Sequence, residues 1–509
     1  MKILFYLKKF FSYRLAIAVF VCGAVVMIFE LIGSRLLAPY LGSSLITWTS
    51  LIGVILASLS LGYWYGGVLA DREASERRLA LIIFVAGILI MAVLPLNKPL
   101  LNFLLTFVWP LQIKSLLASI WLFTPASVAL GMVSPYAVKL RLANLSSAGK
   151  NVGSLYALST LGSLVGTFSA GFWLVPFFGT QKIVAGLAIV LIILALWLYF
   201  TSPRLAEAGG NFNKKLIPKF FIFALALFGL TYWFTRSPAD LIDQDTAYSR
   251  VWIYDSMWGK TRDAVKVMRL DSGYDSAMFL NSDDLVFDYT KYYDLAEYFN
   301  PALNKALMIG GAAYSYPKHF LKTYPRAELT VAEIDPAVTA LAKKYFRLPD
   351  DPRLIIKHAD GRVFLNATKD KYDAIFVDAF ASSFSIPFQL TTKEVAQKEY
   401  SALNDDGLVI VNIVAAVTGP KGRLTRSLYA TYKEVFPQVY LLPIGSVAEA
   451  SRVQNVMLVA LKTKIKPNFE PLTSPYKDFL SHVWTKPLDH EPILTDDWAP
   501  VDYFISQAL

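Results

Sequence analysis

Polar residues directly follow several apolar runs in the second half of the chain, where a parallel sheet would bring them to one edge. The run from 374 to 377 leads into Asp378 and then into a Ser-rich loop. A carboxylate at the end of a buried strand can hold and deprotonate an attacking amine, or it can bind a cation. We therefore interpret Asp378 as a catalytic or ligand-binding residue, with a loop cap as the alternative.

A glycine pair, Gly310-Gly311, follows another apolar run. Glycine lets the backbone approach a ligand closely, and the N-terminus of a following helix offers free N–H groups. The segment does not match the GxGxxG pattern of dinucleotide-binding proteins, and a plain tight turn would also explain it. Glu333 comes about 20 residues later, at the spacing where a carboxylate accepts hydrogen bonds from ribose hydroxyls.

Two further acidic positions have structural explanations beside the functional ones. Asp335 precedes Pro336, and we predict that it caps a helix whose first turn contains the proline. Asp360-Gly361 is a common turn dipeptide, but a carboxylate there would also accept a hydrogen bond from an adenine amino group. The residues alone leave both interpretations of Asp360 open.

The elements that would position these residues are strands and helices in alternation. From Lys305 to the C-terminus the pattern predicts a doubly wound α/β domain of the Rossmann-like, methyltransferase type. Ligands of such sheets bind at the carboxyl ends of the strands. Short alternating segments from Thr246 onward predict a small antiparallel β-unit before it. We expect residues 236–300 to form this unit and residues 301–509 to form the Rossmann-like domain.

The first 235 residues predict a multi-span α-helical membrane bundle. The chain of 509 residues is 55% hydrophobic and 17% charged, and a spanning helix needs about 20 apolar residues. Phe220–Phe234 is a marginal seventh span, and Leu100–Pro110 is predicted to be an interfacial or re-entrant piece. The six clear spans are Leu15–Leu37, Leu45–Leu69, Leu79–Leu96, Ser115–Val138, Val152–Phe178 and Ile183–Phe200.

Basic residues flank these spans and predict their orientation. Before residue 236 there are 18 Lys and Arg but only 5 Asp and Glu, clustered so that a cytoplasmic N-terminus satisfies the positive-inside rule. We predict a multi-pass protein of the cell (inner) membrane. If Phe220–Phe234 stays on the surface, the C-terminal domain is cytoplasmic, which we favour. The net charge of +10 then reflects membrane-flanking loops, and we expect no nucleic-acid partner.

Residues within the spans support further predictions. Glu30 is costly in lipid and is therefore a candidate for a substrate path. The pairs Gly62-xxx-Gly66 and Gly162-xxx-Gly166 predict close helix packing. Cys22 is the one cysteine, so no disulfide forms within the chain, and the four histidines lack the spacing of metal ligands. We predict no metal site.

The segments that carry these residues resemble the spermidine synthase (polyamine aminopropyltransferase) family. The chain is most similar to bacterial membrane proteins in which several spans precede a spermidine-synthase-like domain, and the resemblance covers nearly its whole length. It implies that Glu333 binds the ribose, that Asp360 contacts the adenine, that Asp378 is catalytic, and that Tyr289 and Tyr248 line the amine site. The similar segments are FELIGSRLLAPYLGSS, LVFDYTKYYDL, ALMIGG, VAEIDPAV, DPRLIIKHADGRVFL, YDAIFVDAF, LTTKE and LTDDWAPVDYF.

The chain departs from the family pattern at positions that would bind amines. Ala313 and Ala381 stand where two acids would be expected, and Ser249 and Thr290 stand where glutamines would be. Each charge-assisted contact of this kind is worth roughly 1.5–3 kcal/mol. Near the C-terminus, Asp496 and Asp497 would replace the lost carboxylates if the tail folds over the site. The alternative for this tail is a helix cap or a surface turn.

The resemblance implies a membrane-bound transferase that moves an aminopropyl group from decarboxylated S-adenosylmethionine to a polyamine or another amine. The nucleoside, or S-adenosylmethionine itself, would be a co-substrate rather than a permanently bound cofactor. Three alternatives stay open: a methyl or other alkyl transferase, a non-catalytic nucleoside-binding or regulatory domain, and a transporter whose soluble domain senses or modifies its cargo. The expected partners are a lipid bilayer and a small amine, and a homodimer is also left open.

Overall fold

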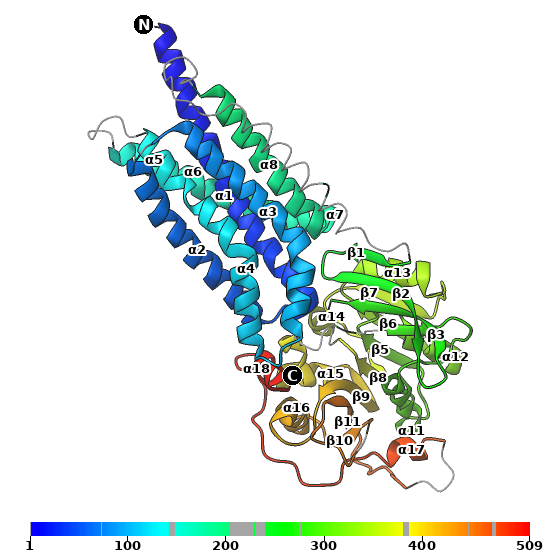
Figure 1. Cartoon of the computed structure of the whole chain (residues 1–509). Coiled ribbons are helices and arrows are strands. Elements are labelled where there is room, and N and C mark those ends of the chain that lie inside the picture. The colour runs from blue at the N-terminus through cyan, green and yellow to red at the C-terminus, as the bar shows by residue number, and fades with distance from the viewer. Residues whose placement is uncertain are drawn as a thin grey trace. The chain divides into compact units, whose positions relative to one another are not determined.

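A computed structural model describes residues 2–72, 74–141, 148–202, 229, 240–271, 273, 276–379, 386–445, 447–470 and 475–508 of the chain. These residues form two compact units, Met1–Pro238 and Ala239–Leu509. The first unit is helical, and the second combines strands and helices (Figure 1). The candidate span Phe220–Phe234 lies outside the described residues, apart from Gly229.

Six helical segments of the described chain are long and apolar enough to cross a membrane. They correspond to the six spans expected from the sequence. In this unit α2 packs on α4, α1 on α6 and α3 on α8. The helices are α1 (Lys2–Leu41), α2 (Leu45–Arg72), α3 (Glu76–Leu105), α4 (Leu111–Gly131), α5 (Val133–Arg141), α6 (Ala148–Ser169), the π-helical turn η2 (Ala170–Leu174), α7 (Val175–Phe178) and α8 (Thr180–Thr201).

The prediction of a separate interfacial or re-entrant piece at Leu100–Pro110 is wrong for its first six residues. Helix α3 continues through Pro95 and Pro99 and ends only at Leu105. Leu101 and Leu104 are buried in the core of the unit. Their burial accounts for the extra helical turns, since apolar packing stabilises helix that the two prolines would otherwise weaken.

The predicted close packing at the small-residue pairs is confirmed. A Cβ atom added to Gly162 would lie 2.0 Å from the carbonyl oxygen of Phe20 in α1, and one added to Gly62 would lie 2.3 Å from that of Val128 in α4. Only glycine therefore permits these two helix contacts at their present distance. Glu30 lies partly buried in α1, and its role in a substrate path stays a prediction.

The second unit begins with a four-stranded antiparallel sheet in the order β1-β2-β3-β4. The alternating segments predicted three of these strands and missed the first. Short helices then connect this sheet to the main one. The elements are β1 (Ile242–Asp245), β2 (Arg250–Trp258), β3 (Asp263–Leu270), β4 (Ser276–Phe279), α10 (Asp288–Lys291), the 3-10 turn η4 (Tyr292–Asp294) and α11 (Leu295–Phe299).

The main sheet has seven strands in the order β10-β11-β9-β8-β5-β6-β7. β9, β8, β5, β6 and β7 are parallel neighbours, whereas β11 is antiparallel to both β9 and β10. The expectation of parallel crossovers holds where a helix separates two strands and fails for β10 and β11, which no helix separates. The strands are β5 (Lys305–Ile309), β6 (Glu328–Glu333), β7 (Leu354–His358), β8 (Tyr372–Val377), β9 (Leu403–Ala415), β10 (Gln438–Pro443) and β11 (Gln454–Leu461).

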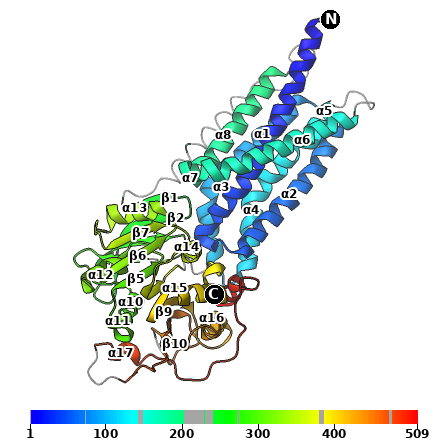
Figure 2. The ribbon, with the colours of Figure 1, turned by 180° about the vertical axis from the view of Figure 1, so that it is seen from behind.

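Helices cover both faces of this sheet, as its continuous apolar strands require. Alternate residues of β8 point to opposite faces: Ile375 and Val377 join one core with α14, α15, α16 and α18, while Ala374 and Phe376 join the other with α11, α12, α13 and α17. Figure 2 shows α15 and α16 beside β9 and β10 from behind. The helices are α12 (Ser315–Thr323), α13 (Pro336–Tyr345), α14 (Gly361–Ala367), α15 (Lys393–Ala402), α16 (Arg423–Lys433), α17 (Lys477–Leu480) and α18 (Val501–Ala508).

Candidate functional site

The polar residues singled out in the sequence lie at the carboxyl ends of four neighbouring strands. The strand ladder continues one residue beyond β8 and β5, because Asp378 N–H donates to the carbonyl of Ile309 and Gly310 N–H donates to that of Ala332, both at 2.9 Å. Since β8, β5, β6 and β7 are adjacent, the turns that follow them form one continuous edge. The sheet thus brings together the residues expected to bind a nucleoside and the expected catalytic acid.

The glycine turn is fastened to the end of β6 by Glu333. Its Oε2 accepts from the N–H groups of Gly311 (2.8 Å) and Ala312 (3.2 Å), and its Oε1 accepts from Asp335 N–H at 2.9 Å. Burial raises the pKa of this carboxyl group, and the three backbone donors oppose that rise. Oε1 accepts only one of these bonds, so it keeps a lone pair for a further donor, and the ribose contact of Glu333 stays a prediction.

The glycine turn has no space for a side chain at Gly310. Gly310 has φ +92°, and a Cβ there would lie 2.3 Å from the carbonyl oxygen of Asp378. The backbones that follow β5 and β8 therefore touch at this point. Ala312 and Tyr314 have φ 43° and 56°, a left-handed conformation that costs roughly 1 kcal/mol for each L-residue. Strain of this kind is typical of functional turns.

Ala313, which replaces the expected acid in this turn, packs into an apolar cluster. Its side chain is fully buried with Val251, Ile253 and Met268 of the small sheet. Its N–H group donates to Ser276 Oγ at 3.2 Å. The position thus joins the glycine turn to the small sheet and contributes no charge to the site.

The two remaining strand-end acids both cap helices. Asp335 accepts from Ala337 N–H at 2.9 Å at the start of α13, which confirms the predicted cap. Asp360 accepts from Val363 N–H at 3.0 Å at the start of α14. Its second oxygen lies 3.4 Å from Gln389 Nε2. Asp360 is therefore a helix cap whose adenine contact stays a prediction, and Gly361 follows it without space for a side chain, since a Cβ would lie 2.4 Å from Ile309.

Asp378 is held by neutral donors on both of its oxygen atoms. Tyr289 donates from its hydroxyl to Oδ2 at 3.2 Å, and Asn412 donates from Nδ2 to Oδ1 at 3.0 Å. Burial raises the pKa of the Asp378 carboxyl group, while these donors and the neighbouring Tyr293 oppose the rise. A carboxylate with a raised pKa is suited to accept a proton from an ammonium group near neutral pH.

Asn412 and Asn455 were not predicted from the sequence. Asn455 Nδ2 donates to Asn412 Oδ1 at 2.9 Å, which turns the Asn412 amide so that its NH₂ group faces Asp378. Asn412 lies on the same face of β9 as Ile410, two residues earlier. Asp378 follows β8 on the same face as Phe376. The available signal was a single polar residue in the otherwise apolar strand segment LVIVNIV.

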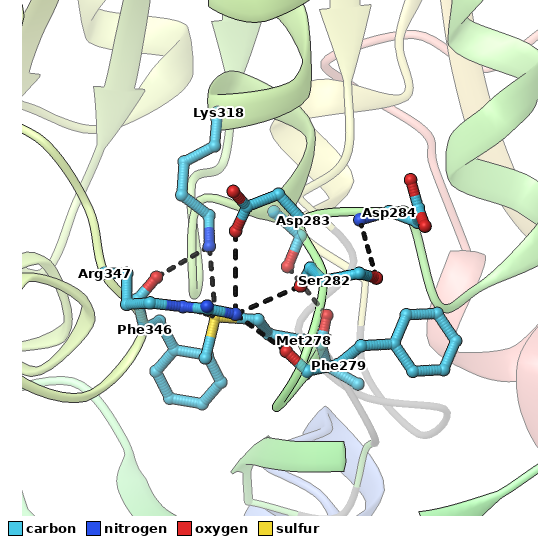
Figure 3. Close-up of polar contacts among 10 residues, drawn as sticks. Met278, Phe279, Ser282, Asp283, Asp284, Lys318, Phe346 and Arg347 are labelled. Carbon is cyan, nitrogen blue, oxygen red and sulfur yellow. Dashed lines mark hydrogen bonds and ion pairs between the residues drawn. The ribbon is translucent and has the colours of Figure 1, made fainter. Parts of the chain in front are cut away.

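The loop that leads to Tyr289 is clamped by a cationic cluster (Figure 3). Arg347 Nη2 donates to the carbonyl oxygens of Phe279 (2.7 Å) and Ser282 (3.0 Å). Lys318 lies in the same cluster, and burial lowers its pKa to about 8. The clamp fixes the connection between β4 and α10 and therefore the place from which Tyr289 reaches Asp378.

The other residues expected near the amine site are exposed or form local hydrogen bonds. Tyr248 lies in the turn between β1 and β2 and is 54% exposed. Ser249 occupies the same turn, where its backbone is bonded to Thr246. Thr290 is buried and donates to the carbonyl of Phe287 at 2.6 Å. Ala381 lies outside the described residues.

The C-terminal tail docks near Asp360 but uses its acid for an ion pair. Asp496 accepts from Arg362 Nη2 and from Thr392 Oγ1, both at 2.7 Å. Its carboxylate is therefore already neutralised by Arg362. The described residues contain no group of three or more His, Cys, Asp or Glu that could hold a metal ion.

Comparison with known proteins gives the same family at the sequence level. Residues 292–459 match the model of the "Spermine/spermidine synthase domain". A probable polyamine aminopropyl transferase of Bifidobacterium longum is 36% identical over 149 residues, which are 28% of this chain and 32% of that protein. Polyamine aminopropyltransferase 1 of Streptomyces coelicolor is 23% identical over 446 residues, which are 80% of this chain and 77% of that protein.

Among solved structures, a probable spermidine synthase from Corynebacterium glutamicum is 21% identical and covers 45% of this chain and 82% of its own, with a TM-score of 0.39. The matched domain contains Asp378 together with the strand ends that carry Gly310, Glu333 and Asp360. The alignment with the Streptomyces coelicolor protein extends over most of both sequences. Residues 292–459 of the chain thus form a domain of the spermine/spermidine synthase family.

Proposed function

We propose that this protein is a membrane-anchored polyamine aminopropyltransferase. It takes the aminopropyl group from decarboxylated S-adenosylmethionine and passes it to the amine of a polyamine or related acceptor. The observation that carries the proposal is the buried Asp378 carboxyl group, held by Tyr289 and Asn412 beside the glycine turn. The match to the spermine/spermidine synthase domain and the names of the relatives support it.

In the proposed reaction, Asp378 removes the proton that keeps the acceptor amine from acting as a nucleophile. The amine nitrogen then attacks the carbon beside the sulfonium. A carbon–nitrogen bond forms as the carbon–sulfur bond breaks, and both electrons of that bond go to sulfur. The products are a neutral thioether nucleoside and the extended amine. Tyr289 and Asn412 keep the Asp378 carboxylate oriented through this exchange.

Glu333, Gly310, Gly311 and Asp360 form the proposed nucleoside-binding edge. Glu333 would accept from the ribose while it holds the glycine turn, and Asp360 would contact the adenine. Gly361 lets the chain after Asp360 pack directly against the side chain of Ile309. Six long apolar helices support the membrane anchor, and we propose a multi-pass protein of the cell membrane with its N-terminus and its second unit in the cytoplasm.

Calorimetric titration of the full chain in detergent tests the donor. Methylthioadenosine, S-adenosylmethionine and its decarboxylated form are compared side by side, with Glu333→Gln as the variant that weakens the ribose contact. We expect binding of methylthioadenosine and a preference for the decarboxylated form, both reduced about tenfold or more in the variant. A preference for S-adenosylmethionine would instead indicate methyl or alkyl transfer, and binding of none of the three would contradict the nucleoside site.

A further inference from the structure

The tail segment Leu494–Trp498, here called the C-terminal strap, is fastened to α15 and α16. Leu494 is fully buried in the core beside these helices. Its N–H group donates to Thr431 Oγ1 of α16 at 2.9 Å, and its carbonyl accepts from Lys393 N–H at the start of α15 at 2.8 Å. The start of the strap therefore has a fixed place in the second unit.

The strap then makes a tight turn that uses one of its two acids. The N–H groups of Thr495 and Trp498 each donate to the carbonyl of the other residue at 3.0 Å, so Asp496 and Asp497 are the two central residues of the turn. The side chain of Asp497 is exposed and makes no ion pair or hydrogen bond in the described part of the chain. Asp496 alone joins the strap to other elements through its side chain.

Asp496 fixes the guanidinium group of Arg362. Its Oδ2 accepts from Arg362 Nη2 and its Oδ1 accepts from Thr392 Oγ1, both at 2.7 Å. Nη1 of Arg362 donates to the carbonyl of Gln389 and to Thr392 Oγ1, both at 3.2 Å. Because the guanidinium group is planar and rigid, a carboxylate that holds one of its nitrogens also sets the direction in which the other donates.

Arg362 acts on both elements that hold Asp360. Gln389 is the central residue of the 3-10 turn η5 (Phe388–Leu390), and its Nε2 lies 3.4 Å from Asp360 Oδ2. The other oxygen, Oδ1, accepts from Val363 N–H in the first turn of α14, the turn that also carries Arg362. A continuous set of hydrogen bonds thus leads from the strap to the Asp360 carboxylate.

We propose that Asp496 is a positioning residue for nucleoside recognition, which acts through Arg362 and Gln389 to hold the Asp360 carboxylate toward the amino group of an adenine. This inference rests on the nucleoside site of the proposed function and assigns the strap a part in it. An adenine amino group donates to a carboxylate, whereas the carbonyl of hypoxanthine at the same place would put an oxygen atom against it. The strap therefore contributes to the choice of base more than to the affinity for nucleosides in general.

The test compares two nucleosides and two matched variants of the full-length protein in detergent. Calorimetric titration measures the binding of methylthioadenosine and of methylthioinosine, in which a carbonyl replaces the adenine amino group. Asp496→Ala removes the contact with Arg362, and Asp497→Ala is the same change at the neighbouring position of the same turn. The side chain of Asp496 is 45% exposed, so its ion pair adds little stability, and both variants should unfold at nearly the wild-type temperature.

We expect the wild type to prefer methylthioadenosine about 100-fold or more. Asp496→Ala should reduce this preference about tenfold, mainly by weaker binding of methylthioadenosine, while Asp497→Ala should leave it within about twofold. Arg362→Gln should cause a similar reduction. Adding Asp496→Ala to Arg362→Gln should then reduce the preference no further, because the two residues act through one contact.

The possible results separate the strap from the nucleoside site. An unchanged preference in Asp496→Ala, or an equal loss of affinity for both nucleosides, would overturn the role of the strap and leave the proposed function standing. A wild-type protein that binds both nucleosides equally would overturn the role of Asp360 in base recognition and that of the strap. A wild-type protein that binds neither would contradict the proposed nucleoside site itself.

Discussion

The protonation state of Asp378 depends on the residues that surround it. Burial favours the neutral acid, whereas hydrogen bonds from Asn412 and Tyr289 favour the carboxylate. The proposed transfer needs the carboxylate at the start and the acid at the end, so these two influences must nearly balance. Asn455 contributes indirectly, since it fixes which end of the Asn412 amide faces the carboxyl group.

Replacement of Asn412 tests this balance. In Asn412→Leu the carboxylate loses a donor, so the pKa of Asp378 rises. The ascending limb of the pH–rate profile should then move by about one pH unit to higher pH, and the rate at a fixed pH on that limb should fall about tenfold. Asn404→Leu is a matched control, because Asn404 makes a similar bond of 2.7 Å to Asp373 near the amino end of the same strand. An unshifted profile for Asn412→Leu would contradict the assigned role.

Among individual functional residues, the sequence identified those that end or follow strands and missed those within strands. Asp378, Glu333 and Asp360 could be found because they end apolar runs. Asn412 and Asn455 became significant only through the pairing of β9 with β11, which depends on tertiary contacts. Tyr248 lies largely exposed in the turn between β1 and β2, and its place at the amine site stays a prediction.

Among the elements of the second unit, the chain after β5 touches the chain after β8 at the glycine turn. Gly310→Ala would place a methyl group against the backbone of Asp378 and would force a residue with a side chain into φ +92°. We expect a loss of stability of about 2–4 kcal/mol and a loss of nucleoside binding.

Gly419→Ala is the control for Gly310→Ala. Gly419 also has a positive φ, +71°, but an added Cβ would meet nothing within 4 Å. We expect Gly419→Ala to lower the free energy of unfolding by only about 1 kcal/mol. Thermal unfolding followed by tryptophan fluorescence measures both variants. Equal losses for the two variants would show that the contact with Asp378 does not matter.

Close contact between helices gives a second prediction at the scale of elements. Gly162→Leu would place side-chain atoms against the backbone of α1, whereas a Cβ at Gly153 of the same helix meets nothing within 4 Å. We expect Gly162→Leu to lower the melting temperature of the detergent-solubilised protein by several degrees, at a cost of about 2 kcal/mol or more. Gly153→Leu should leave it nearly unchanged, and a similar drop in both would contradict the packing.

Strand and helix periodicity predicted ten of the eleven strands of the second unit and its helices α12 to α16, because their amphipathic pattern is local. It missed β1 and the short helices α10, α11, α17 and α18. The antiparallel placement of β11 between β9 and β10 was not predicted, since it depends on which sheet edge is free after β9 forms. The helical extension of α3 past Pro99 was missed for a similar reason. Burial of Leu101 and Leu104 against other helices decided it.

For the molecule as a whole, buried ionisable groups link stability to pH. Glu399 is fully buried between α15 and α16, and burial raises its pKa from 4.5 to about 8. Because the folded state holds this proton more tightly than the unfolded state, its contribution is greatest below pH 4.5 and is lost as pH rises toward 8. The total change is about 3–5 kcal/mol.

Glu399→Gln removes this titration but keeps an acceptor for the Tyr432 hydroxyl, which donates to Glu399 at 2.8 Å. The free energy of unfolding of the variant, followed by denaturant titration, should decline less than that of the wild type between pH 5 and pH 8. The two proteins should differ most near pH 9. Parallel pH dependences would show that Glu399 is not held neutral in the folded protein.

The central claim is aminopropyl transfer by Asp378, and one measurement tests it most directly. The purified full-length protein is incubated with decarboxylated S-adenosylmethionine and a diamine, and mass spectrometry follows the extended amine and methylthioadenosine. We predict equal amounts of both products from the wild type, and a loss of at least about 100-fold in Asp378→Asn, which keeps the shape of the side chain but cannot accept the proton. No product from the wild type, or undiminished product from Asp378→Asn, would contradict the account.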